Sequence, residues 1–143
     1  MENILAAMDP AETHFYAGLH ALNLAKRIKA KVLFLLVCPP STKRSARSRE
    51  NKAEASVKKR LAALIEEARS DGITVEYYVV HGRFEKELVS FVQANKITLL
   101  VIESSAEGDS IDGTKAFLDK IRHRIDCRIE VVNEKPETSE RKE

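Results

Sequence analysis

The acidic segment from Val101 to Ile111, VIESSAEGDSI, is the part of the chain whose side chains most directly suggest a ligand site. An apolar strand is predicted to run into it, and ligands of open α/β sheets bind where such strands end. Like charges about 4 Å apart repel by roughly 1 kcal/mol in water and about 4 kcal/mol at an effective dielectric of 20, so a phosphate would be repelled here. Within ten residues and without lysine or arginine stand Glu103, Glu107, Asp109 and Asp112.

Two further roles are open to these acidic residues. Magnesium could bridge carboxylates and phosphates. Asp109, Ser110 and Asp112 are also good N-cap residues, and acids in a first helical turn suit the helix dipole. We favour the capping role, because carboxylates in a surface loop are more often solvated than bound to metal.

Apolar runs of strand type alternate with stripes of helical period along the chain, which predicts crossovers and a mainly parallel sheet with helices on both faces. The fold class is therefore α/β, a three-layer α/β/α sandwich. The strands are expected at Ile4–Met8, Val32–Cys38, Ile73–Val80, Leu99–Ile102 and Arg128–Val132. The helical stripes run over residues 18–28, 57–68 with Gly72 as C-cap, 84–92 and 117–125.

Composition limits the kinds of partner. The 143 residues fit one domain, residues 1–133, and residues 134–143 are predicted to be a disordered tail. With 24 basic and 22 acidic residues the net charge is +2, so no overall field draws the chain to nucleic acid or membrane. No signal peptide or long apolar run is present, which predicts a cytoplasmic protein. The basic block from Lys43 to Arg60 is interpreted as a solvated loop that leads into a helix, rather than a polyanion site.

Candidates for catalysis and metal binding are few. His81 alone among four scattered histidines precedes a glycine at a predicted strand end, and we interpret it as a polar lining residue rather than a base. Cys38 and Cys127 are expected to be small buried residues at opposite ends of parallel strands, too far apart for a disulfide. We predict no catalytic residues and no metal site. The histidines are His14, His20, His81 and His123.

The ordered set of segments resembles the universal stress protein family over about residues 2–133. The resemblance rests on ILAAMDPAETHFYAGLHALNLAKRIKAKVLFLLV, then VHGR from Val80, LLVI from Leu99 and CRIEVV from Cys127. It implies a Rossmann-like, adenine nucleotide alpha hydrolase-like fold with strand order 3-2-1-4-5. It also implies a homodimer formed by the last strands, here Arg128, Ile129, Glu130, Val131 and Val132.

In nucleotide-binding members of that family, the resemblance implies contacts from Asp9 and Val37 and phosphate binding by a G-x2-G-x9-G-[ST] loop. Glu103 and Ala106 stand at the first two glycine positions of this chain. The physical need for glycine there is close backbone approach to an anion. If nucleotide binds at all, the candidate contacts are Asp9, Val37, Gly82, Gly108, Gly113 and Thr114.

Asp9 has a second interpretation, because Asp-Pro is a common start of a helix and Asp9 could cap one beginning near Ala11. We favour that capping role. The preferred function is a non-catalytic regulatory or stress-response domain that acts through dimerisation and an unidentified protein partner, without cofactor. The alternative is an ATP- or AMP-binding member, with magnesium, that uses Asp9, Val37 and the loop from Gly108 to Thr114, with slow hydrolysis at most.

Overall fold

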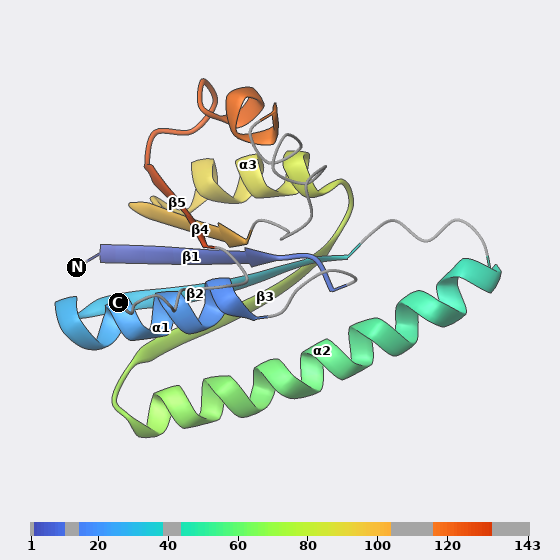
Figure 1. Ribbon diagram of the computed structural model, residues 1–143, viewed down its shortest axis with the longest axis horizontal. Coiled ribbons are helices and arrows are strands. Elements are labelled where there is room, and N and C mark those ends of the chain that lie inside the picture. The colour runs from blue at the N-terminus through green and yellow to red at the C-terminus, as the bar shows by residue number, and fades with distance from the viewer. Residues whose placement is uncertain (1, 11–14, 39–43, 104–115, 133–143) are drawn as a thin grey trace, which may run out of the picture.

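The computed structural model describes residues 2–10, 15–38, 44–103 and 116–132, with side chains of the second helix described from Glu54 onward (Figure 1). Strands and helices alternate along these residues, with a short helical segment over residues 116–121 before the last strand. Their order is β1 (Glu2–Met8), α1 (Tyr16–Ile28), β2 (Ala30–Cys38), α2 (Arg44–Ser70), β3 (Thr74–His81), α3 (Phe84–Ala94), β4 (Leu99–Glu103) and β5 (Arg128–Val132).

The five strands form one parallel sheet in the order β3-β2-β1-β4-β5. Figure 1 shows α1 and α2 on one face of this sheet and α3 on the other. The predicted fold class and strand order are therefore confirmed. Because the strands are parallel, their carboxyl ends meet at a single edge, and the predicted nucleotide contacts Asp9, Val37 and Gly82 belong to that edge.

Alternate residues of each strand supply two separate cores. Ile4, Val32 and Phe34 belong to the core beneath α1 and α2, whereas Leu5 and Leu33 belong to the core beneath α3. The whole of β2 except Lys31 is buried, which explains why its sequence is a nearly continuous apolar run rather than an alternating one.

Helix α2 packs through a stripe made of Val57, Leu61, Ile65 and Ala68, as the helical period predicts. Gly72, with a φ of 86°, follows its last turn in the left-handed conformation typical of a C-cap glycine. None of the helices in the described part of the chain has the length and apolar character needed to cross a bilayer.

Three expectations from the sequence are corrected. Helix α2 begins at Arg44, so most of the basic block is helix rather than loop. Helix α1 begins at Tyr16 rather than near Ala11, and Phe15 rather than Asp9 stands at its N-cap position. Cys127 is only half buried, because it lies just before the edge strand β5.

The last predicted helix also ends earlier than expected. Helical residues end at Ile121 and are followed by a turn. Ile121 and Ile125 are nevertheless both buried in the core beneath α3. The predicted disordered tail and the capping residues Asp109, Ser110 and Asp112 lie outside the described residues.

Candidate functional site

The register of the sheet brings Asp9 and Val37 together. Met8 is paired with Leu36, so the next residues along the two strands, Asp9 and Val37, lie side by side at the carboxyl edge. The side chain of Val37 is buried toward α3, which leaves its backbone as the part that could face a ligand at this edge. Gly108, Gly113 and Thr114 lie outside the described residues.

Gly82 lies directly after β3 at the same edge. Its N–H donates a hydrogen bond to the carbonyl oxygen of Cys38 at 2.9 Å, and this ties the end of β3 to the end of β2. A Cβ atom at this position would meet the carboxylate of Glu87 at 2.6 Å. The φ of Gly82, 157°, is a conformation that residues with a Cβ rarely adopt and gives this position a structural reason to be glycine. Its predicted role toward a nucleotide stays a prediction.

Glu103, the residue at the first glycine position, ends β4 and turns its side chain to α1. Its Oε2 accepts a hydrogen bond from the backbone N–H of Ala17 at 3.5 Å. Helix α1 has no side-chain cap of its own at Phe15 and no acidic residue in its first turn. The carboxylate of Glu103 therefore supplies, from a neighbouring strand, the negative charge that the amino end of a helix favours.

On the other half of the edge, Cys38, Glu54 and His81 form a compact cluster. Cys38 and His81 are paired residues of β2 and β3, and both project toward the face that α2 covers. Glu54 reaches down from α2, and its Oε2 lies 3.6 Å from Nε2 of His81 and 3.2 Å from Nζ of Lys58. The side chain of Glu54 is only 13% exposed, whereas that of His81 is 56% exposed.

The electrostatics of this cluster favour a neutral thiol and an ionised carboxylate. Burial, followed by the charge of Glu54 and a hydrogen bond to it, raises the pKa of Cys38 to about 12. Burial opposes ionisation of Glu54, but Lys58, the Cys38 thiol and His81 together lower the pKa of this carboxyl. Burial, followed by electrostatic interaction with Cys38 and Glu54, raises the pKa of Tyr77, whose buried hydroxyl has no hydrogen-bond partner among the described residues.

The sequence indicated parts of this cluster but not the cluster itself. It placed Cys38 and His81 at the ends of consecutive strands, and burial of Cys38 is confirmed. It missed Glu54, which lies on the packing stripe of α2 one turn before Lys58. The signal that could have found it is a charged pair, Glu54 and Lys58, in the helical phase of the buried residues Leu61 and Ile65.

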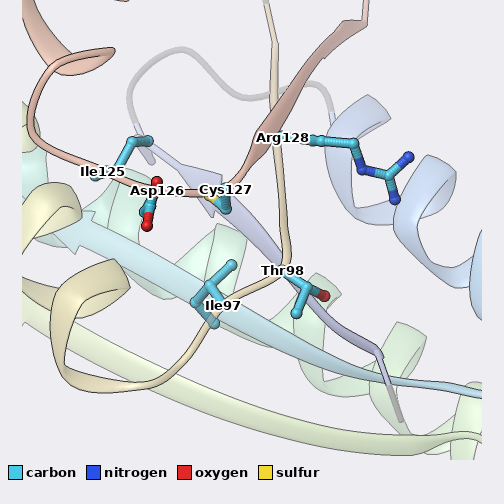
Figure 2. Close-up of a pocket in the computed structure, with 6 residues that line it drawn as sticks. All are labelled: Ile97, Thr98, Ile125, Asp126, Cys127 and Arg128. Atoms are coloured by element: carbon cyan, nitrogen blue, oxygen red, sulfur yellow. The ribbon is translucent and has the colours of Figure 1, made fainter.

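A shallow pocket of about 420 Å³ lies at the opposite edge of the sheet (Figure 2). Its residues directly precede β4 or β5, except Arg128, which begins β5, so the pocket is remote from the carboxyl edge. The lining residues are Ile97, Thr98, Ile125, Asp126, Cys127 and Arg128. No group of three potential metal ligands occurs there among the described residues, and we assign the pocket no function.

Comparison with known proteins agrees with this geometry. A sequence model of the universal stress protein family matches residues 1–117, which is most of the chain. The chain belongs to the universal stress protein family. A comparison with curated proteins found no match.

Solved structures show the same fold for this universal stress protein. The universal stress protein UspA from Lactobacillus plantarum is 16% identical and superposes with a TM-score of 0.72, over 92% of this chain and 97% of the other. A universal stress protein in complex with cAMP is 21% identical, with a TM-score of 0.66 over 92% and 96%. An Arabidopsis thaliana family protein with AMP bound is 14% identical, with a TM-score of 0.62 over 99% and 97%.

The thiol of Cys38 is predicted to be nearly inert toward alkylation at pH 8, because its pKa of about 12 keeps it protonated. In a Cys127→Ser background, Glu54→Gln should increase the alkylation rate several-fold, since it removes a charge that raises the thiol pKa and leaves the Lys58 ammonium nearby. The rate is measured by mass spectrometry between pH 7 and 10. Glu66→Gln, on the exposed side of α2, is the control. Equal rates in the two variants would contradict the assigned role of Glu54.

Replacement of Glu103 by alanine is predicted to lower the free energy of unfolding by about 0.5–1 kcal/mol. This lies in the lower part of the range for loss of an N-cap, because the 3.5 Å contact to Ala17 is long. Urea denaturation measures the change, with Glu66→Ala as the control. A Glu103→Ala protein as stable as the parent would show that the carboxylate does not stabilise α1.

Proposed function

We propose that this universal stress protein is a non-catalytic, regulatory stress-response domain in the cytoplasm. In this proposal it acts through dimerisation and contacts with a partner protein, and it has lost ATP binding. The observation that carries the proposal is the position of Glu103, whose carboxylate lies at the amino end of α1.

Two consequences follow from the Glu103 contact. The residue at the first glycine position has a side chain with a structural task, so the close backbone approach that glycine would give a phosphate is not offered there. Its negative charge also lies on the strand next to Asp9, because the pairing of Ala6 with Val101 brings the ends of β1 and β4 together. An incoming polyphosphate would meet two carboxylates from these strands, while Glu103 and Ala106 replace the first two glycines of the phosphate-binding pattern.

The alternative function is ATP or AMP binding through Asp9, Val37 and the loop from Gly108 to Thr114, with magnesium. It is favoured by the AMP and cAMP complexes of two structural relatives. The adjacency of Asp9 and Val37 at the carboxyl edge is compatible with it. The two functions differ in one measurable property, the affinity for adenine nucleotide.

We predict that the full chain shows no saturable binding of ATP at micromolar concentrations, with or without magnesium, because the phosphates are repelled by Glu103. Isothermal titration calorimetry measures the binding, with a nucleotide-binding universal stress protein as the positive control. The proposal fails if ATP binds stoichiometrically in the micromolar range and Asp9→Ala abolishes that binding.

The dimerisation part of the proposal rests on β5. In the described part of the chain this strand pairs with β4 on one side only, so its other side is an open edge of the sheet. Val131 is an exposed apolar side chain on this edge strand, and Arg128 and Glu130 are exposed beside it. His20 of α1 contacts Glu130 at 2.6 Å and helps to hold the strand in place. An exposed edge strand is a ready surface for pairing with a second copy.

Val131→Lys is predicted to weaken the dimer at least about tenfold, which corresponds to roughly 1.4 kcal/mol. The change removes an apolar contact and brings two like charges together across the paired strands. Analytical ultracentrifugation at micromolar concentration measures the equilibrium. Thr74→Lys, on the edge strand at the other side of the sheet, is the matched control. A monomeric parent protein, or equal weakening by both substitutions, would contradict the assigned interface.

A further inference from the structure

Three side chains of different chemistry, the thiol of Cys38, the carboxylate of Glu54 and the imidazole of His81, converge at the carboxyl edge of β2 and β3. One ligand atom from each lies within 4.8 Å of the other two. None of these three residues is among the candidate nucleotide contacts, so the cluster is separate from the function proposed above. Among the described residues this is the one group of at least three potential metal ligands that meets the distance.

Strand pairing sets the backbone positions of Cys38 and His81, and the packing of α2 directs the side chain of Glu54 toward them. Cys38 is fully buried on β2, and its strand partner His81 is held in register by the parallel pairing. Glu54 belongs to the stripe through which α2 packs, so its side chain points at the sheet rather than at solvent. The exposed imidazole of His81 can adjust its position without disturbing the core. The ligands therefore come from three elements whose relative positions are set by packing.

We propose that Cys38, Glu54 and His81 bind a divalent transition metal ion, and that the donor set suits Zn²⁺. Zinc is bound by cysteine sulfur at about 2.3 Å and by histidine nitrogen or carboxylate oxygen at roughly 2.0–2.2 Å. Ligand atoms around a tetrahedral zinc ion are then roughly 3.5 Å apart, so the distances within the cluster, 4.8 Å at most, need to shorten by no more than about 1.3 Å. A thiolate excludes magnesium and calcium, which prefer oxygen ligands.

Three protein ligands leave a fourth position for water or an external ligand, as in open zinc sites. The Cys38 proton is released to solvent when the thiolate binds the metal, so that thiolate and carboxylate together balance the charge of the ion. The buried hydroxyl of Tyr77, which precedes His81 on the same face of β3, adds a polar group that the apolar core does not explain.

Lys58 is the natural competitor of the ion. Its ammonium group lies 3.2 Å from the same oxygen of Glu54 that faces His81. Because the Lys58 side chain is half exposed, it can turn to solvent when an ion takes its place. Removal of the lysine charge should therefore strengthen metal binding, whereas removal of a ligand should weaken it.

The test uses the full chain, freed of metal by a chelator and titrated first with Co²⁺ as a spectroscopic probe and then with Zn²⁺. We expect one ion per chain and a thiolate-to-cobalt charge-transfer band, which Zn²⁺ abolishes by displacement. The band should be lost in Cys38→Ser and kept in Cys127→Ser. His81→Ala and Glu54→Gln should each weaken Zn²⁺ binding by roughly tenfold or more.

Removal of the Lys58 charge should change the affinity for Zn²⁺ in the opposite direction to removal of a ligand. Lys58→Gln should bind Zn²⁺ more tightly than the parent protein, and Lys59→Gln, at the exposed neighbouring position, should bind it equally well. Circular dichroism establishes that each variant is folded. His81→Ala alters an exposed side chain and keeps the test valid if Cys38→Ser unfolds. The proposal is overturned if the parent protein binds no ion, if folded Cys38→Ser keeps the cobalt band, or if folded His81→Ala binds Zn²⁺ as the parent does.

Discussion

The parallel pairing of β2 with β1 and β3 is the constraint on which the rest of the structure depends. Because α1 and α2 cover one face of the sheet and α3 covers the other, almost every β2 side chain must be apolar. Polar side chains of β2 are then confined to its ends, and the register decides which side chains of the neighbouring strands meet them. Cys38 faces His81 and Asp9 lies beside Val37 because the strands are paired as they are, rather than because these residues are close in sequence.

The carboxyl edge divides into two halves with different chemistry. On the half formed by β1 and β4, Asp9 and Glu103 are acidic, and Glu103 is engaged with the amino end of α1. On the half formed by β2 and β3, a neutral thiol, a carboxylate and an imidazole lie together beneath α2. In our proposal the first half disfavours a polyphosphate, and the second offers donors for a divalent transition metal ion. The two halves of one edge would then differ in the class of ligand that they favour.

Much of this architecture could be predicted from the chain itself, because burial on both faces leaves a clear pattern. The apolar run that ends at Cys38 and the stripe from Val57 to Ala68 are direct consequences of packing, and both elements form as expected. The start of α2 at Arg44 was missed, because its first turns carry charged and small residues that favour helix without an apolar stripe. The cluster at Cys38 was missed because Glu54 and His81 are far apart in sequence, and only the position of α2 on the sheet brings them together.

The central claim is that the carboxyl edge near Glu103 does not bind nucleotide phosphate. Amide chemical shifts of isotope-labelled protein test it most directly, because they report on Asp9, Val37 and Glu103 separately while magnesium and ATP are added. The account predicts no saturable shifts at these amides up to millimolar ATP. Saturable, stoichiometric shifts at all three would contradict it and would place a nucleotide at the edge after all.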